Sequence, residues 1–159
     1  MKKLLLLTLA LPALLLVQSC TKAISSPSVY DQTDVSQVVG TWYLGEAAQY
    51  NGGGWNYFNT GLEKGIFTFY ANGSASYDDG YNRMDGNWSV ITISDGYYDR
   101  YGVFHSDIHD AFKLHLYDAY SNNSITLNFD DIYATGGTLV GTSYSGGTIS
   151  RYTFYRYFK

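Results

Sequence analysis

The chain has 159 residues, enough for one domain and short for two, and 10 basic against 14 acidic side chains give a formal net charge of −4. Its 17 tyrosines, eight phenylalanines and three tryptophans all follow position 20, and this aromatic, glycine-rich composition predicts an all-β domain. An acidic chain without a basic patch repels anions, which argues against nucleic acid as a partner.

The first 19 residues have the pattern of a secretory signal peptide. Lys2 and Lys3 give a short basic start, and residues 4–17 are almost wholly apolar but too short to span a hydrocarbon core of about 30 Å. We therefore expect cleavage and not a membrane helix. Loss of this segment removes two of the ten basic residues and none of the acidic ones, which changes the net charge from −4 to −6.

The end of this segment, Val17-Gln18-Ser19-Cys20, resembles the lipobox of bacterial lipoproteins. The resemblance implies that Cys20 is acylated, with chains such as palmitate, and becomes the mature N-terminus; the alternative is an ordinary signal followed by a stray cysteine. Cys20 is the only cysteine, so an internal disulfide is excluded. At about 0.8 kcal/mol per buried methylene, two or three acyl chains would make attachment to the membrane permanent.

Residues 20–37 are polar around Ser25-Ser26-Pro27-Ser28, and we expect the lipidated cysteine to be followed by a flexible tether. No acidic residue directly follows Cys20, and residues 22–25 lack the acidic cluster that resembles a surface-export tag in Bacteroidetes. We therefore expect a protein of the cell envelope that is anchored to the outer membrane and faces the periplasm.

Residues 38–44 are predicted to form the first strand, in which Trp42 and Leu44 share one face. The motif Gly40-Thr41-Trp42 resembles the Gly-x-Trp signature of lipocalins and related calycins, whose domains are common in lipoproteins of Bacteroidetes. The resemblance implies that residues 38–159 form a single antiparallel up-and-down β-barrel of eight or nine strands. It also implies structural roles for Gly40 and Trp42, and a basic residue of the last strand that packs across the indole.

Two arginines, Arg151 and Arg156, lie in the last predicted strand, residues 148–158. If this strand runs antiparallel to the first, Trp42 should meet a residue near its end. Arg156 lies nearer the end and shares the parity of the apolar Phe154, whereas Arg151 faces the opposite side. We therefore predict that Arg156 covers Trp42, a contact worth about 2 kcal/mol when it is desolvated.

Residues 66–70 form the second predicted strand, and Asn72-Gly73 turns it into the third. A two-residue turn would set the phenylalanines of the second strand opposite polar residues. Because a one-residue slip exchanges the core and solvent faces, we predict instead a three-residue loop with Gly73 in the left-handed conformation. The resulting apolar pairs are Phe69 with Ala75 and Phe67 with Tyr77.

The rest of the domain has apolar alternation at hairpin spacing. It predicts strands over residues 86–93, 97–104, 112–117, 125–130, 138–144 and 148–158. The last two should form a closing hairpin about Ser145-Gly146-Gly147. Residues 105–111 are the least regular part, and we expect one helical turn there.

Residue types that could carry catalysis or bind a metal do not form a sufficient set. His105 and His109 are four residues apart, but no third fixed metal donor is evident, so a solvated loop is the preferred interpretation. The carboxylate pairs Asp78-Asp79 and Asp130-Asp131 are adjacent in sequence, so each pair would point to opposite faces of a strand. No serine-hydrolase or zinc-protease motif is present. We therefore expect a protein without catalysis, cofactor or metal.

The surplus of aromatic residues is the main functional hint, although a purely structural role, filling the barrel, is the preferred interpretation of it. The favoured hypothesis is a barrel that binds a small apolar or amphipathic molecule through Trp42, Phe67, Phe69, Tyr77, Trp88, Leu114, Leu116, Leu127, Phe129 and Phe154. Trp55 and Tyr57 in the glycine-rich loop 50–61 would form its lid, or else fold back onto the rim. The alternative is a glycan-binding or protein-interaction lipoprotein that uses exposed aromatics, with a row formed by Tyr97, Tyr98, Tyr101, Tyr144 and Tyr155.

Overall fold

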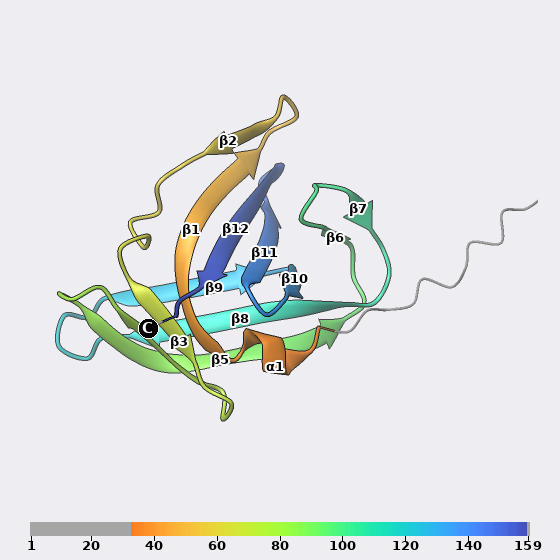
Figure 1. Ribbon diagram of the computed structural model, residues 1–159. Coiled ribbons are helices and arrows are strands. Elements are labelled where there is room, and N and C mark those ends of the chain that lie inside the picture. Colours follow the sequence, from red (N-terminus) through yellow and green to blue (C-terminus); the bar gives the residue numbers. More distant parts are fainter. Residues whose placement is uncertain (1–32, 159) are drawn as a thin grey trace, which may run out of the picture.

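The computed structural model describes residues 33–158, so the predicted signal peptide, Cys20 and most of the predicted tether lie outside the described residues. Antiparallel strands make up most of this part of the chain (Figure 1). One short helix, α1 (Val35–Val38), precedes the strands β1 (Gly40–Tyr50), β2 (Trp55–Tyr57), β3 (Ile66–Phe69), β4 (Ser74–Asp78), β5 (Arg83–Ile93), β6 (Tyr97–Tyr98), β7 (Phe104–His105), β8 (His109–Tyr117), β9 (Ser124–Phe129), β10 (Asp131–Ala134), β11 (Thr138–Ser145) and β12 (Thr148–Arg156).

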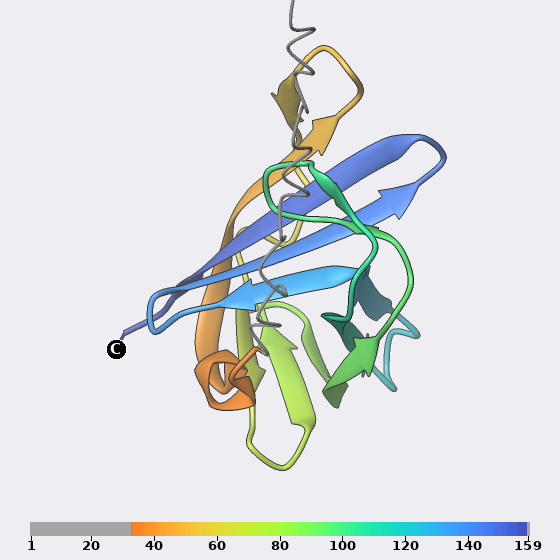
Figure 2. The same cartoon turned by 90° about the vertical axis from the view of Figure 1, so that its right-hand side faces the viewer.

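The main sheet has ten strands in the order β10-β11-β12-β1-β3-β4-β5-β8-β9, with β2 paired to β1, whereas β6 and β7 form a separate two-stranded sheet. The prediction of an all-β antiparallel fold is confirmed. Within residues 33–158 the strand pairings follow an open path, and no ladder closes the sheet into a barrel. Strands β11 and β12, in one half of this path, run in a clearly different direction from β5 and β8 in the other half (Figures 1 and 2). The two halves enclose one core between them.

The two ends of this strand path are consecutive in the chain, because only Asp130 separates β9 from β10. β9 pairs with β8, and β10 pairs with β11. Hydrogen bonds of Asp130 fix the point at which the chain changes its pairing partner from β8 to β11. Its N–H donates to the carbonyl of Thr142 at 2.7 Å, and its carboxylate accepts from the N–H of Tyr144 at 2.7 Å. The chain therefore leaves β8 after Phe129 and continues along β11.

The first and last long strands lie side by side, with Trp42 opposite Arg156. The Arg156 guanidinium lies 4.1 Å from the centroid of the Trp42 ring, which is the contact expected from the sequence. It also donates to the carbonyls of Val39, Gln37 and Gly136 at 2.7, 3.0 and 3.0 Å.

Gly40 belongs to the same structural unit. Its φ is +143°, and an added Cβ would lie 1.8 Å from a guanidinium nitrogen of Arg156. Only glycine leaves room for the arginine at this position.

The β3–β4 hairpin has the predicted register, which is confirmed by the pairs Phe67–Tyr77 and Phe69–Ala75. Gly73 has a φ of +82°, in the left-handed region, and its N–H donates to the carbonyl of Tyr70 at 3.0 Å. The Asn72 side chain accepts from the N–H of Ser74. Glycine supplies the positive φ that closes a three-residue loop and keeps both phenylalanines on the core face.

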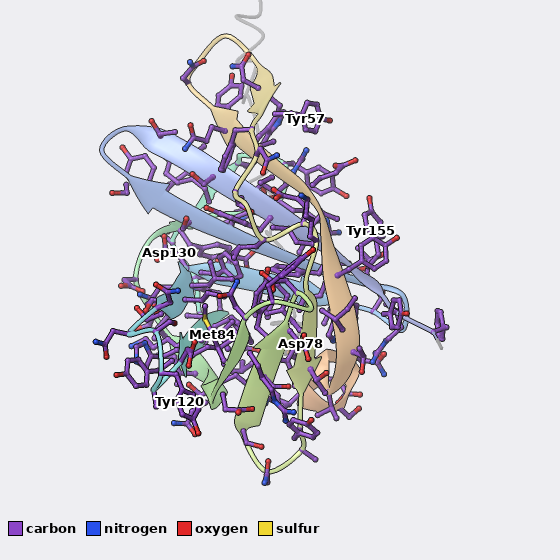
Figure 3. All side chains as sticks on the ribbon, turned by 90° about the vertical axis from the view of Figure 1, so that its left-hand side faces the viewer. Tyr57, Asp78, Met84, Tyr120, Asp130 and Tyr155 are labelled. Atoms are coloured by element: carbon purple, nitrogen blue, oxygen red, sulfur yellow. The ribbon has the colours of Figure 1, made fainter. Side chains whose placement is uncertain are left out.

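Aromatic side chains from both halves of the sheet fill the core. The ring of Phe154 on β12 lies 5.5 Å from Phe67 on β3 and 6.3 Å from Phe129 on β9. The ring of Phe112 on β8 lies 5.5 Å from Phe69 and 5.8 Å from Phe129. These rings are almost completely buried, and Figure 3 shows side chains occupying the space between the strands. Their packing holds the two halves together.

The prediction of one strand over residues 97–104 is wrong. The segment forms the β6–β7 hairpin, because the Asp99 carboxylate accepts from the N–H groups of Tyr101 and Val103, both at 2.9 Å. A short acidic side chain that bonds nearby amides competes with the strand ladder and makes a turn. The helical turn expected within residues 105–111 is also wrong, since β8 already begins at His109.

The N-terminal edge of the packed region lies earlier than predicted. Thr33 to Gln37 were assigned to the tether, yet Asp34 caps α1 by accepting from the N–H of Ser36 at 2.9 Å, and Val38 at the end of α1 is fully buried. The first strand consequently begins at Gly40 and not at Val38. A one-turn helix carries no sequence period, which is why alternation did not reveal it.

Candidate functional site

The predicted interior site residues are brought together, but by packing against one another. The side chains of Trp42, Phe67, Phe69, Tyr77, Trp88, Leu114, Leu116, Phe129 and Phe154 belong to one buried cluster, and Leu127 packs against it. Phe67 and Tyr77, for example, have ring centroids 4.7 Å apart. These side chains therefore fill the interior that they were expected to line.

The two predicted lid residues lie on β2, outside the core. Trp55 stacks on the Arg151 guanidinium, which lies 4.1 Å from its ring centroid, and its ring lies 5.6 Å from that of Tyr50. Arg151 in turn donates to the carbonyl of Arg100 at 3.1 Å. Tyr57 is 68% exposed. Trp55 thus links β2 to the loop of the β6–β7 hairpin, whereas Tyr57 points into solvent.

The five tyrosines expected to form one exposed row do not do so. Tyr144 lies next to the β11–β12 turn, opposite Ile149, whereas Tyr155 lies at the other end of the same hairpin, opposite Thr138. Tyr155 is also far from Asp130, which binds the backbone of Tyr144 (Figure 3). Six residues of strand separate the two levels by about 20 Å.

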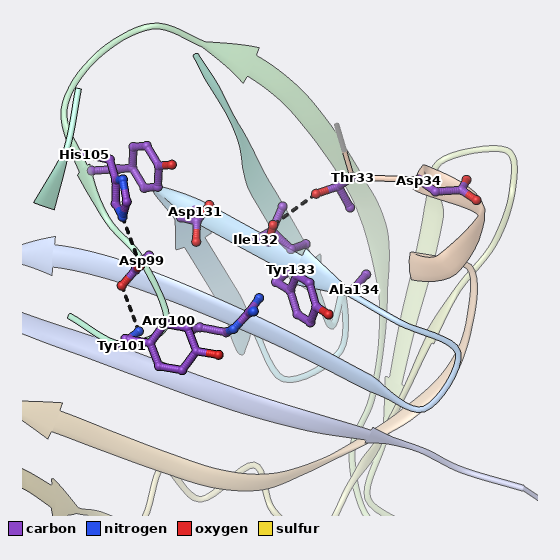
Figure 4. A pocket seen from close by; sticks show the side chains of 11 residues that line it. Thr33, Asp34, Asp99, Arg100, Tyr101, His105, Asp131, Ile132, Tyr133 and Ala134 are labelled. Carbon is purple, nitrogen blue, oxygen red and sulfur yellow. Dashed lines mark hydrogen bonds and ion pairs between the residues drawn. The ribbon is translucent and has the colours of Figure 1, made fainter. Parts of the chain in front are cut away.

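A cavity of about 390 Å³ lies between β10, the β6–β7 hairpin and the residues that precede α1 (Figure 4). We call it the Arg100 pocket. It contains none of the predicted interior residues, and its lining consists of Thr33, Asp34, Tyr97, Asp99, Arg100, Tyr101, His105, Asp131, Ile132, Tyr133 and Ala134.

Thr33 closes one side of the Arg100 pocket. Its N–H donates to the carboxylate of Asp110 on β8 at 2.7 Å, and its hydroxyl donates to the carbonyl of Ile132 on β10 at 3.0 Å. The residue therefore bridges the two strands that the turn at Asp130 has separated. Asp110 is 4% exposed and also accepts from the hydroxyl of Thr92 at 3.0 Å. The carboxylate that accepts from Thr33 is therefore itself held in place.

The β6–β7 hairpin forms the opposite side, and Asp99 orders it. Besides its two backbone bonds, Asp99 lies 3.0 Å from Nε2 of His105. Burial alone would raise the pKa of Asp99, but the backbone bond from Val103 and the bond with His105 hold it below its ordinary value. Asp99 is therefore an ionised structural group whose oxygen atoms are already engaged.

Arg100 projects into the pocket over aromatic rings. Its guanidinium carbon lies 3.6 Å from the centroid of the Tyr133 ring and 4.9 Å from that of Tyr101. Within residues 33–158, no hydrogen bond or ion pair of this guanidinium accompanies these contacts. The stacking fixes the plane of the guanidinium and leaves its N–H groups available to a ligand.

Asp131 supplies a second polar group. Burial raises its pKa to about 6, an effect that His109 and Arg100 oppose and Asp99 reinforces. Tyr97 stands nearby, its ring 3.9 Å from that of the buried His109 and 5.1 Å from that of His105. Burial, with the charges of Asp107 and Asp131, raises the pKa of Tyr97 to about 12. At neutral pH the pocket therefore presents a neutral phenol beside a carboxyl that titrates near 6.

The sequence pointed to only part of this site. Tyr97 and Tyr101 were singled out as glycan contacts, and Asp131 was considered only within an adjacent carboxylate pair. Arg100, Tyr133 and Thr33 were missed. One signal was present, because Arg100 is the only basic residue in the tyrosine-rich segment 97–104.

Comparisons of the chain with protein-family models, with curated proteins and with solved structures found no match. In the described part of the chain, no three or more His, Cys, Asp or Glu side chains are grouped so that they could hold a metal ion. No helix among residues 33–158 has the length and apolar character that crossing a membrane requires. The observed class is an antiparallel all-β protein with a polar and aromatic pocket between β10 and the β6–β7 hairpin.

Proposed function

We propose that this protein is a lipid-anchored envelope lipoprotein whose lipocalin-like domain binds a small amphipathic ligand of the glycan class, without catalysis, in the Arg100 pocket. The observation that carries the proposal is the combination of tyrosine faces, guanidinium donors and a carboxyl in one cavity. Sugars present apolar ring faces and hydroxyl groups together, so they match such a lining. The filled interior favours this pocket over the expected apolar site.

A lipocalin-like barrel is part of the proposal. Its support is the direct passage from β9 to β10, which joins the two ends of the strand path through one residue, Asp130. The packing of Arg156 over Trp42 adds to this support, because the Gly-x-Trp resemblance implied such a contact. In such a barrel, the diverging segments β9 and β10 would close the sheet in place of a continuous ladder of hydrogen bonds.

The lipid anchor rests on the resemblance of Val17-Gln18-Ser19-Cys20 to a lipobox. Cys20 and Thr33 are thirteen residue-to-residue steps apart, with twelve residues between them, so an extended chain reaches at most about 45 Å. Because Thr33 lines the Arg100 pocket, the ligand would be held within that distance of the outer membrane, on its periplasmic side. Cells given an alkyne-tagged palmitate should label the protein, and the Cys20→Ala variant should lose both the label and the membrane attachment.

Binding is tested by titrating the purified protein with mono- and oligosaccharides and following tyrosine and tryptophan fluorescence. We expect saturable binding that Arg100→Ala and Tyr133→Ala weaken by tenfold or more. Matched controls are Arg83→Ala and Tyr120→Ala, since the Arg83 side chain is 71% exposed and Tyr120 is fully exposed. Binding of a fatty acid but of no saccharide, unchanged by the pocket variants, would refute the proposed site.

A further inference from the structure

Among the arginines of residues 33–158, Arg100 stands out by what its guanidinium contacts. Arg156 donates to three carbonyls, Arg151 donates to one, and Arg83 pairs with Asp85 at 3.8 Å. The Arg100 guanidinium has only ring contacts, with Tyr133 and Tyr101. A guanidinium that lines a cavity and has no hydrogen-bonded or ion-paired anion can receive one from a ligand.

The carboxylates of the pocket do not already take this role. Asp99 is engaged by two backbone N–H groups and by His105. Asp131 affects Arg100 through its charge, yet the two form no ion pair within 4 Å. Asp34 is engaged in capping α1. The guanidinium therefore keeps its planar pair of N–H donors for a group that enters the pocket.

The position of this guanidinium is also fixed in advance. Tyr133 lies on β10, whose pairing with β11 fixes its backbone, and its ring supports one face of the guanidinium. The backbone of Arg100 is held by the bond from Arg151 to its carbonyl. A planar donor pair held in this way matches the two oxygens of a carboxylate, which point charges such as ammonium groups recognise less specifically.

We infer that the Arg100 pocket selects sugars that carry a carboxylate, of the uronic acid class, with Arg100 binding the carboxylate and the surrounding tyrosines contacting the ring. This inference rests on the proposed function and adds the charge of the ligand. Asp131 is the second polar contact, and in its protonated form it donates a hydrogen bond to the bound acid.

This arrangement makes binding depend on pH. Asp131 faces His109 on β8, Tyr97 on β6, and Asp99 and Arg100 in the β6–β7 loop. Its ionised form would repel the ligand carboxylate, whereas its protonated form would not. With a pKa of about 6, the protonated fraction falls from about three quarters at pH 5.5 to about 3% at pH 7.5. The ligand stays ionised at both values, so affinity should fall up to roughly 25-fold over this range.

The experiment titrates the full protein with glucuronate, glucose, glucosamine and cyclohexanecarboxylate at pH 5.5 and 7.5 by calorimetry. We expect glucuronate to bind at least tenfold more tightly than the other three. Arg100→Ala should abolish this preference, and Arg100→Lys should weaken it by about tenfold, because lysine keeps the charge and loses the planar donor pair. Asp131→Asn should bind glucuronate equally at both pH values. Arg83→Ala is the control, and thermal unfolding verifies that each variant is folded.

The possible outcomes distinguish a failure of the inferred uronic acid preference from a failure of the proposed saccharide binding. Equal binding of glucose and glucuronate would overturn the acid preference and leave saccharide binding intact. Equal binding of cyclohexanecarboxylate would identify a general carboxylate site and overturn the assignment to sugars. Unchanged pH dependence in Asp131→Asn would remove Asp131 from the site. Absence of binding by all four probes, with a folded protein, would overturn the inference, while other saccharides could still satisfy the proposed function.

Discussion

Replacement of Arg156 by alanine tests the contact that joins the first and last long strands. The change removes three hydrogen bonds to carbonyls of Gln37, Val39 and Gly136 and the stacking on Trp42. Net contributions of about 1 kcal/mol per bond, reduced because the side chain is partly exposed, and about 1 kcal/mol for the stacking predict a loss of about 3 kcal/mol. For a domain of this size the melting temperature should fall by about 10 °C.

Urea unfolding followed by tryptophan fluorescence measures this loss directly. Arg156→Lys keeps the charge without the planar donors and should lose about half as much free energy. Arg83→Ala is the matched control, because both partners of its ion pair are about 70% exposed, and it should change stability by less than about 0.5 kcal/mol. If Arg156→Ala unfolds at the same urea concentration as the control, the contact does not stabilise the fold.

Three further changes test the core, a turn and the pocket. Phe67→Ala empties a fully buried site among aromatic rings and should cost about 3–5 kcal/mol in urea unfolding. Gly73→Ala forces a Cβ into φ +82° and should cost about 1–2 kcal/mol by the same measurement. For Asp131, the folded pKa near 6 exceeds the unfolded value near 4, so the carboxyl makes folding less favourable as pH rises from 4 to 6. Asp131→Asn should therefore stabilise by about 1–2 kcal/mol at pH 7.5 and by little at pH 4; equal effects at both would refute the shift.

Strand positions and one long-range contact could be predicted where the pattern itself contains the physical cause. In the β3–β4 hairpin, glycine at 73 and the two phenylalanines of β3 leave one register that buries both rings. The Arg156 contact followed from parity and from the antiparallel arrangement of the terminal strands. Alternation likewise located β8, β9, β11 and β12 to within a few residues.

The Arg100 pocket could not be predicted in the same way, because no local pattern encodes it. Its walls come from Thr33, from the loop ordered by Asp99 and from the short strand that follows Asp130. Each depends on one side chain that bonds to backbone groups and overrides the tendency of neighbouring tyrosines to extend a strand. Such local competition decides where the strands stop, and the cavity lies where they stop.

The pairing of β1 with β12 also constrains how the protein is made. Arg156 bonds to Val39 across 117 positions of sequence, and β1 lies beside β12 along most of its length. The ribosome must therefore have synthesised nearly the whole domain before these strands can meet, and non-local pairing of this kind folds slowly. The sheet therefore stays incomplete during synthesis, and its terminal strands pair only after the end of the domain has been made.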